Sequence, residues 1–288
     1  MPFIELQAHL KQALAEIGLE SSEVDAETRF IMRFLGFSRL DELRAGSREI
    51  TPDIWQRANA VLQRRARREP LQYILGTQDF YGLELEVSPA VLIPRPETEE
   101  LVTLVYSHLP TQGELTIADL GTGSGAIALA LAHMLQQAGR NYTLWASDLS
   151  EAALALAVRN GLKYGLNNRI VWLSGHGLEP FLQQGLKLDA LVSNPPYIPL
   201  VVWRQLAPEV RDFEPQMALT PGQDALYFYR LLAEQGPGLL KSGGWLCVEL
   251  DADQAEQTAR LFQSEAWQEV ALKPDFNGLN RFLCALRV

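Results

Sequence analysis

The chain has 288 residues, an apolar fraction of 47% and a formal net charge of −10 at pH 7. This length and composition suit one large or two ordinary globular domains with a proper core. The acidic balance disfavours a nucleic-acid partner unless arginines gather in a patch, because like charges repel. The sequence has no apolar run of about 18 residues and no basic signal-like start, so we expect a cytoplasmic protein without membrane segments.

Cysteine and histidine usage argues against a metal site. Cys247 and Cys284 each lie within an apolar, strand-like run, so we interpret them as buried thiols and not as a disulfide framework. The four histidines are scattered and lack metal-ligand spacing. We therefore predict that no metal is bound.

The first 75 residues predict a small all-helical domain. Apolar residues recur at helical spacing over 3–17 and 21–35. A third helix is expected to begin at Thr51-Pro52, with proline in its first turn, and to stop before Pro70. No catalytic group of residues is visible here, so this part is either a substrate-recognition module or a stabilising cap.

One basic cluster lies at the end of this helical part. It consists of Arg64, Arg65, Arg67 and Arg68. The cluster is the candidate nucleic-acid patch, although a charge run of this kind is more often a solvated helix face. We favour the solvated face.

Residues 76–92 predict a β-hairpin that links the helical part to the rest. Apolar residues and glutamates alternate from Leu83 to Val87, which is typical of a half-exposed strand. The proline-flanked segment Leu92–Glu99 follows. Its acidic residues suit the first turn of a helix, where they complement the helix dipole.

A glycine-rich turn comes next. The strand Leu115–Leu120 leads into Gly121-Thr122-Gly123-Ser124-Gly125, and a helix follows over Ala126–Gln137. Strand, glycine turn and helix in this order open a nucleotide-binding half-sheet. Glycine lets the backbone turn tightly and lets a ligand approach where a Cβ would obstruct it.

An acidic residue ends the second strand. Tyr142–Ser147 is expected to be this strand, and Asp148 closes it, about 20 positions after the glycines, where an acidic side chain suits ribose hydroxyls. Asp148 or Ser150 also suits the N-cap of the following helix. Both roles are compatible.

The remaining strands complete a parallel sheet with an antiparallel insertion near the end. His176 follows the third strand, at 170–173, and Asn194 follows the fourth, at 188–192. Later strands are expected at 245–250, 270–272 and 282–286, with the last one inserted antiparallel. Ligands of open α/β sheets bind at the carboxyl edge of the strands. The glycine turn, Asp148, His176 and Asn194 should therefore meet there.

The segment Ser193-Asn194-Pro195-Pro196-Tyr197 provides the most informative chemistry. Prolines end the strand and stiffen the backbone, which leaves the carbonyls of Asn194 and Pro195 without local partners. Beside these acceptors lie an amide and the aromatic face of Tyr197. Such a corner fits a planar group that carries an NH2, either a carboxamide or an exocyclic base amine. An ordinary Asn-Pro turn is the alternative.

These motifs carry a family resemblance. Asp119–Gly125, Asp148 and Asn194-Pro-Pro-Tyr197, in this order, resemble the class I S-adenosylmethionine-dependent methyltransferases that methylate planar nitrogen. Ile93–Glu99 and the helical N-terminal part resemble the protein glutamine N5-methyltransferases of class 1 peptide chain release factors. The resemblance covers essentially the whole chain, and Pro96-Glu97-Thr98 favours this family over the related ribosomal-protein glutamine methyltransferases.

The resemblance implies a fold, a reaction and a partner. The fold is a Rossmann-like α/β methyltransferase sheet at 93–288, joined by the hairpin at 76–92 to a helical substrate-recognition domain at 1–75. The reaction transfers a methyl group from S-adenosyl-L-methionine to the N5 amide nitrogen of the glutamine in the Gly-Gly-Gln motif of class 1 release factors. No direct nucleic-acid binding and no membrane contact are expected.

The resemblance also assigns site residues. Gly121, Thr122, Gly123, Ser124 and Gly125 would shape the cofactor pocket, Asp148 would bind its ribose, and Asn194 would border it. Asn194, Pro195, Pro196 and Tyr197 would hold the substrate glutamine, with Asn194, Pro195 and Tyr197 acting in catalysis. The family places an acidic or aromatic residue after the third strand, where this chain has His176. That histidine is expected either beside the adenine or in a surface loop.

Other functions remain compatible with the residues. A ribosomal-protein glutamine methyltransferase and a nucleic-acid adenine N6-methyltransferase both use such a corner. The latter usually needs a base-flipping platform and a cationic surface. A third possibility is a cofactor-binding assembly factor without catalysis.

Overall fold

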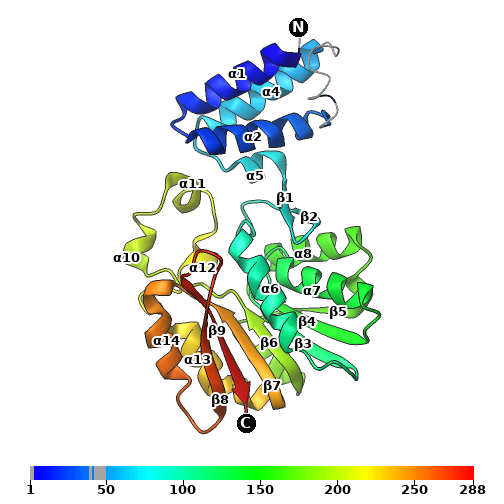
Figure 1. The fold of residues 1–288 in the computed structure, drawn as a ribbon, viewed down its shortest axis with the longest axis vertical. Helices are drawn as coiled ribbons and strands as arrows, with labels where there is room; N and C mark the ends of the chain where they lie inside the picture. The colour runs from blue at the N-terminus through cyan, green and yellow to red at the C-terminus, as the bar shows by residue number, and fades with distance from the viewer. Residues whose placement is uncertain (1–2, 39–40, 42–49) are drawn as a thin grey trace. The chain divides into compact units, whose positions relative to one another are not determined.

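The computed structural model describes residues 3–38, 41 and 50–288. The chain forms two compact units, drawn in Figure 1. The smaller unit comprises the chain up to Thr77 together with Ala207–Phe213, and the larger one comprises Gln78–Leu206 and Glu214–Val288. Each unit has its own buried apolar core.

The smaller unit is helical, as predicted. It contains α1 (Phe3–Glu16), α2 (Ser21–Phe34), α4 (Pro52–Arg65), α5 (Leu71–Leu75) and α11 (Pro208–Arg211). One apolar stripe of each long helix faces a shared core. Thr51 caps α4 and Pro52 occupies its first turn, as expected. The cap of α2 is instead a reciprocal pair, Glu20 and Glu23.

The predicted hairpin consists of β1 (Thr77–Phe80) and β2 (Leu83–Glu86). Tyr81 and Gly82 form its two-residue turn with φ values of 50° and 77°, as right-twisted strands require. The buried side chains of the hairpin pack into the core of the larger unit. Asn160 of α8 (Glu151–Lys163) fixes the hairpin further, because its Oδ1 accepts from the Glu86 N–H at 2.7 Å and its Nδ2 donates to the Glu86 carbonyl at 3.0 Å.

A seven-stranded sheet forms the centre of the larger unit, in the order β5-β4-β3-β6-β7-β9-β8. The strands are β3 (Leu115–Leu120), β4 (Tyr142–Asp148), β5 (Ile170–Ser174), β6 (Leu188–Ser193), β7 (Leu240–Glu249), β8 (Trp267–Pro274) and β9 (Asn280–Arg287). The first five in spatial order are parallel, and β9 lies antiparallel between β7 and β8. This confirms the predicted α/β sheet with its antiparallel insertion.

Both faces of the sheet are covered by helices (Figure 1). Residues of α6 (Pro96–His108) and α7 (Ala126–Gln137) pack on one face, and residues of α13 (Tyr227–Leu239) and α14 (Ala255–Leu261) pack on the other. Successive strand residues alternate between the two cores, as Ile117 and Ala118 of β3 do. Shorter helices complete the unit: η1 (Asn167–Arg169), α9 (Glu179–Gln183), α10 (Leu200–Trp203), α12 (Gln216–Leu219) and η2 (Ala252–Gln254).

Strand β3 pairs with β4 on one side and with β6 on the other, so the strand order reverses there. This switch point is where open α/β sheets bind ligands.

Over the described residues, every helix is too short or too polar to cross a bilayer.

Candidate active site

A cavity of about 260 Å³ opens at the carboxyl ends of β3, β4, β5 and β6. Seven of the residues singled out by the sequence line it: Gly121, Gly123, Asp148, His176, Asn194, Pro195 and Pro196. The structure therefore brings motifs from four strand ends to one place. Thr122, Ser124, Gly125 and Tyr197 are not among the described residues that line this cavity.

The glycines of the turn have two different roles. Gly121 and Gly123 have φ values of 74° and 56°, and a Cβ added to either would meet no other atom within 4 Å. Since both residues line the cavity, that Cβ would extend into open space. Gly125 is different, because its Cβ would lie 3.0 Å from Leu129 Cδ1 and 3.3 Å from Ala157 Cβ. It permits close packing of α7 and leaves the cavity wall to the other two.

Thr122 and Ser124 anchor the turn to buried residues of the larger unit. Both are buried, and the Thr122 hydroxyl donates to Asp119 Oδ2 at 2.7 Å. Asn160 Nδ2 donates to the Ser124 carbonyl at 2.9 Å. Burial raises the pKa of Asp119 to about 7, although the bond from Thr122 favours the charged form. These contacts fix the shape of the turn.

Asp148 ties the end of β4 to the glycine turn. Its Oδ2 accepts from the Gly123 N–H and its Oδ1 accepts from the Ser150 N–H, both at 2.8 Å. Ser150 is the N-cap of α8, because its Oγ accepts from the Ala153 N–H at 3.2 Å. Of the two caps considered, the structure uses Ser150. Burial raises the pKa of Asp148, whereas its bonds from backbone N–H groups favour the charged form. The remaining lone pairs of the carboxylate are available to a ligand.

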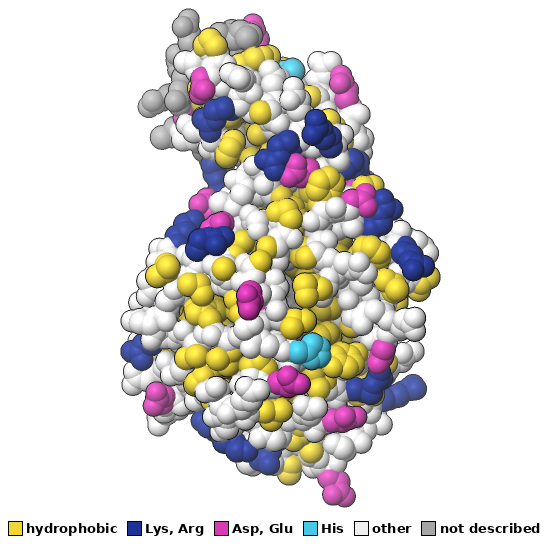
Figure 2. Space-filling view, turned by 180° about the vertical axis from the view of Figure 1, so that it is seen from behind, with side chains coloured by type: hydrophobic (Ala, Val, Ile, Leu, Met, Phe, Trp, Pro, Cys, Tyr) yellow, Lys and Arg dark blue, Asp and Glu magenta, His cyan; other side chains and the backbone are white. Residues whose placement is uncertain are grey.

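His176 lies in an aromatic wall of the cavity. Its ring centroid is 5.9 Å from that of Tyr227 and 6.1 Å from that of Phe228. All three residues line the cavity. Sequence reasoning did not single out Tyr227 and Phe228, although the aromatic run Tyr227-Phe228-Tyr229 was a usable signal. Figure 2 shows one face of the molecule on which hydrophobic side chains predominate over charged ones in the larger unit.

The orientation of the Asn194 amide follows from a chain of hydrogen bonds. Thr98 Oγ1 donates to Glu249 Oε2 at 2.7 Å, and Asn194 Nδ2 lies 3.1 Å from Thr98 Oγ1. A hydroxyl carries one proton, so Thr98 accepts from Asn194. The Asn194 Nδ2 therefore faces Thr98, and its Oδ1 has no donor among the described residues. This oxygen is left for a ligand.

The prolines extend this set of acceptors. Neither Pro195 nor Pro196 has an N–H group, and within the described residues no donor reaches the carbonyls of Asn194 and Pro195. Ser193, at the end of β6, anchors the segment because its Oγ donates to the Leu120 carbonyl at 2.8 Å. Among the described residues, these two carbonyls are therefore unpaired acceptors.

Tyr197 lies behind the corner. Its Oη donates to Glu249 Oε1 at 3.3 Å, and its carbonyl accepts from Gln254 Nε2 at 3.1 Å. Burial raises the pKa of Tyr197, so the phenol stays neutral and remains a donor. The ring packs against the core on the α13 face of the sheet.

Glu214 holds the Ile93–Glu99 motif. Its Oε1 pairs with Arg95 Nη2 at 2.5 Å and its Oε2 accepts from the Ile93 N–H at 3.2 Å. Residues just after Glu214, from Pro215 to Pro221, help to line the cavity. Glu214 is buried and distant in sequence from the motif, so no local pattern announced it.

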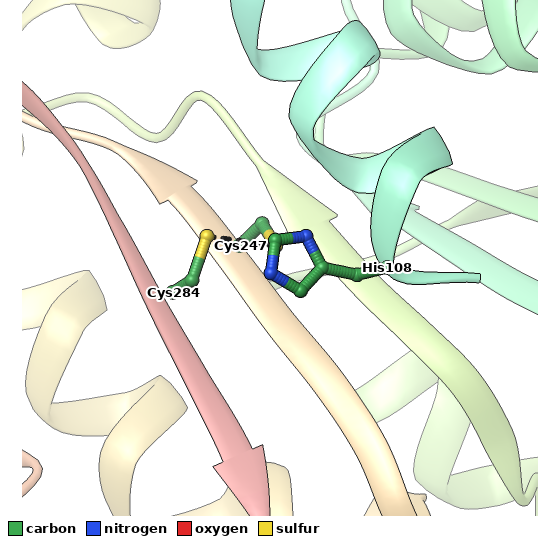
Figure 3. Close-up of side chains that lie close together, drawn as sticks. All are labelled: His108, Cys247 and Cys284. Carbon is green, nitrogen blue, oxygen red and sulfur yellow. Dashed lines mark hydrogen bonds between the residues drawn. The ribbon is translucent and has the colours of Figure 1, made fainter. Parts of the chain in front are cut away.

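One group of side chains has metal-ligand chemistry (Figure 3). His108, Cys247 and Cys284 place three possible ligand atoms within 4.8 Å of one another. Their sequence spacing gave no sign of this, because α6, β7 and β9 each supply one. The Cys284 thiol donates to Cys247 Sγ at 3.2 Å, and this bond together with burial raises the pKa of Cys247. The cysteines are free thiols, as predicted, and the group lies outside the cavity lining.

The arginine cluster in the smaller unit is largely paired. Arg64 pairs with Glu69, Arg65 pairs with Glu27 and Glu209, and Arg68 pairs with Glu209. Paired charges attract phosphate weakly, so the geometry favours a structural role for this cluster.

The fold and the site together define a Rossmann-like class I methyltransferase. Among solved structures, the hMettl16 catalytic domain in complex with the MAT2A 3′UTR hairpin 6 has this fold, with 14% identity, a TM-score of 0.54 and 82% coverage of both chains. A putative rRNA-methylase from Clostridium thermocellum has a TM-score of 0.50 at 13% identity and covers 68% of this chain and 100% of its own.

Sequence comparisons give the family. A model of the PrmC N-terminal domain matches residues 5–76, and a model of the methyltransferase small domain matches residues 100–201. The release factor glutamine methyltransferase of Moorella thermoacetica is 40% identical, over 96% of this chain and 98% of its own. That of Geobacter sulfurreducens is 39% identical, over 93% and 90%. The chain belongs to the release factor glutamine methyltransferase family.

Proposed function

We propose that this chain transfers a methyl group from S-adenosyl-L-methionine to the N5 amide nitrogen of the glutamine in the Gly-Gly-Gln motif of class 1 release factors. The observation that carries the proposal is the orientation of the Asn194 amide. The Asn194 NH2 donates to Thr98 Oγ1, so the Asn194 Oδ1 is left for a ligand. Curated relatives that this chain matches over nearly its whole length bear the name release factor glutamine methyltransferase.

The residues at the glycine turn fit the cofactor. Gly121 and Gly123 leave open space where a side chain would intrude, and Asp148 offers carboxylate lone pairs suited to ribose hydroxyls. His176, Tyr227 and Phe228 give flat surfaces against which an adenine ring would stack. When bound, S-adenosyl-L-methionine supplies a methyl group on a cationic sulfonium sulfur.

The residues at the proline corner fit a carboxamide. The nitrogen of an amide is a poor nucleophile because its lone pair is delocalised into the carbonyl. Asn194 Oδ1 and the Pro195 carbonyl would accept hydrogen bonds from the two N–H groups and hold the nitrogen in one orientation. Such positioning reduces a barrier by several kcal/mol in favourable cases. The same acceptors stabilise positive charge as it develops on the nitrogen, and one of these N–H groups loses its proton to solvent.

A protein partner is the better match for the molecule's charge. The net charge is −10, and three of the four clustered arginines are paired with glutamates. We assign the recognition of the release factor to residues 1–75, the helical part that a PrmC N-terminal domain model matches over residues 5–76. Because release factors act on cytoplasmic ribosomes, we place the activity in the cytoplasm.

Mass spectrometry tests the proposal. Purified protein is incubated with labelled S-adenosyl-L-methionine and, in parallel, with a class 1 release factor, a ribosomal protein mixture, DNA and RNA. We expect one methyl group on the glutamine of the Gly-Gly-Gln motif. A release factor in which this glutamine is replaced by glutamate is the matched control and should take up no label.

The other outcomes are equally informative. Labelling of a ribosomal-protein glutamine would identify the neighbouring substrate class. Labelling of adenine in DNA or RNA, with binding that weakens as salt rises, would replace the proposal with a nucleic-acid methyltransferase. Cofactor binding without transfer to any acceptor would indicate a non-catalytic role.

A further inference from the structure

Glu249 is a buried carboxylate directly behind the substrate corner. It ends strand β7 and is 2% exposed. Its two oxygens accept from different residues, with Thr98 Oγ1 at 2.7 Å from Oε2 and Tyr197 Oη at 3.3 Å from Oε1. Burying an ionised carboxylate is costly unless it is paired. The carboxylate is therefore held by the two residues that support the corner.

The hydrogen bonds through Thr98 have a direction. An ionised carboxylate is purely an acceptor, so the Thr98 hydroxyl points its proton at Glu249. Thr98 then accepts from Asn194 Nδ2, and the Asn194 carbonyl oxygen faces away from Thr98. If Glu249 carried a proton and donated it to Thr98, the threonine proton would turn to Asn194. The amide would then be favoured in the opposite orientation, with its NH2 as the exposed group.

We infer that Glu249 is a positioning residue: its carboxylate orients Asn194 through Thr98 and holds Tyr197 directly, so that acceptors, and not donors, meet the substrate NH2. This inference rests on the proposed function. It adds Glu249, a residue on strand β7 that does not itself line the cavity, to the residues that serve this function.

Several charged or titratable groups surround this carboxylate. Arg281 on β9 favours its charged form and Glu97 on α6 opposes it. Tyr229 on α13 donates to the Glu249 backbone carbonyl at 3.0 Å. Asp251 follows β7, and Asp275 lies 3.6 Å from Arg281 and shares its charge. Burial outweighs the favourable contacts and raises the pKa of Glu249 to about 7.

The test measures methylation of a release factor by wild type and four variants over a range of pH. Glu249→Gln keeps the shape but cannot titrate, and Thr98→Val removes the hydroxyl at nearly constant volume. Thr98→Ser keeps the hydroxyl and serves as the conservative control. Glu256→Gln, on the exposed surface of α14, controls for the loss of a surface charge. S-adenosylhomocysteine binding by calorimetry and thermal unfolding are measured for each.

The expected pattern separates orientation from folding. Wild-type kcat/KM should fall about tenfold per pH unit as the pH drops below about 7, because protonated Glu249 can donate to Thr98, whose proton then turns to Asn194. Glu249→Gln should lack this acid limb and lose about 10- to 100-fold at pH 8. Thr98→Val should lose a similar factor, and Thr98→Ser should recover most of it. Binding of S-adenosylhomocysteine should change less than about twofold throughout.

Other results overturn the inference. Wild-type activity in Glu249→Gln and Thr98→Val would do so, as would equal losses in Thr98→Ser and Thr98→Val. Loss of product binding in step with activity would show a merely structural role. If Glu249→Gln fails to fold, the threonine pair and the wild-type pH profile decide. A wild-type protein inactive on every release factor would instead refute the proposed function.

Discussion

On the glycine side of the cavity the shape comes from the backbone, whereas on the proline side it comes from side chains of separate elements. Gly121 and Gly123 shape the first side through their positive φ values, with Asp148 bonded to a backbone N–H. On the second side, Asn194 takes its orientation from Thr98 and Glu249, on α6 and β7. The first side is shaped mainly by the backbone of one short stretch, whereas the second depends on side chains from separate elements.

This difference predicts how each side responds to mutation. The glycine turn changes shape when a Cβ is added, and such a substitution should affect only cofactor binding. The hydrogen bonds from Glu249 through Thr98 to Asn194 are lost when any one member is removed, and such a substitution should affect only methyl transfer. Asn194→Ala, Asp148→Ala and Gly123→Ala should show this separation, and Asp119→Asn reports on the stability of the glycine turn.

Asn194→Ala is expected to have the largest effect. It removes the acceptor oxygen from the substrate corner, and kcat/KM for release factor methylation should fall by about 1,000-fold or more. Binding of S-adenosylhomocysteine, followed by calorimetry, should remain within about threefold of wild type. Equal loss of both would show that the two sides are not separable.

Asp148→Ala should have the next largest effect, and this effect should be on cofactor binding and not on methyl transfer. The variant loses the carboxylate suited to ribose hydroxyls and the bond to the Gly123 N–H, so product binding should weaken about 100-fold. With saturating cofactor, the remaining kcat should recover to within about tenfold of wild type. A kcat that stays at the Asn194→Ala level would break the comparison.

Asp119→Asn tests the buried support of the glycine turn. Burial raises the pKa of Asp119 to about 7 in the folded protein from 3.8, so folding favours its protonated form. The wild type should therefore lose stability, relative to Asp119→Asn, as the pH rises from about 5 to about 8, by on the order of 1–2 kcal/mol. Urea unfolding at both pH values measures this difference. An unchanged difference would place the titration elsewhere.

Gly123→Ala should have the smallest effect. The added Cβ enters open space in the cavity at a positive φ, and product binding should weaken about five- to tenfold. Gly113→Ala is a matched control, since Gly113 also has a positive φ with no neighbour near its Cβ but does not line the cavity. Both variants should lose similar stability, and only Gly123→Ala should lose affinity.

The sequence predicted the locally encoded parts of the molecule well. The strand Leu115–Leu120 and the helix Ala126–Gln137 have the predicted bounds, and the antiparallel insertion is present. Strand β7 begins at Leu240, earlier than the predicted residue 245, because Gly243 and Gly244 obscured its start. Helix α13 was not predicted, since Gly236, Pro237 and Gly238 resemble a loop although the helix continues through them.

The parts of the site that escaped prediction are those that depend on distant residues. Thr98 and Glu249 are 151 positions apart, and Asn194 and Thr98 are 96 apart. No local pattern indicates that these side chains meet. The same holds for Glu214 and for the placement of Tyr227 beside His176. The motifs indicated candidate ligand-contacting groups, and only the packed fold shows which distant residues orient them.

Asn160 links two regions that are far apart in sequence. Its single amide group bonds the N–H and the carbonyl of Glu86 in the hairpin. The same group also bonds the carbonyl of Ser124 in the glycine turn. A ligand that rigidifies the turn should consequently slow amide hydrogen exchange in β2 as well, at a distance from any direct contact. The hairpin would thus report, residue by residue, whether the cavity at the strand ends is filled.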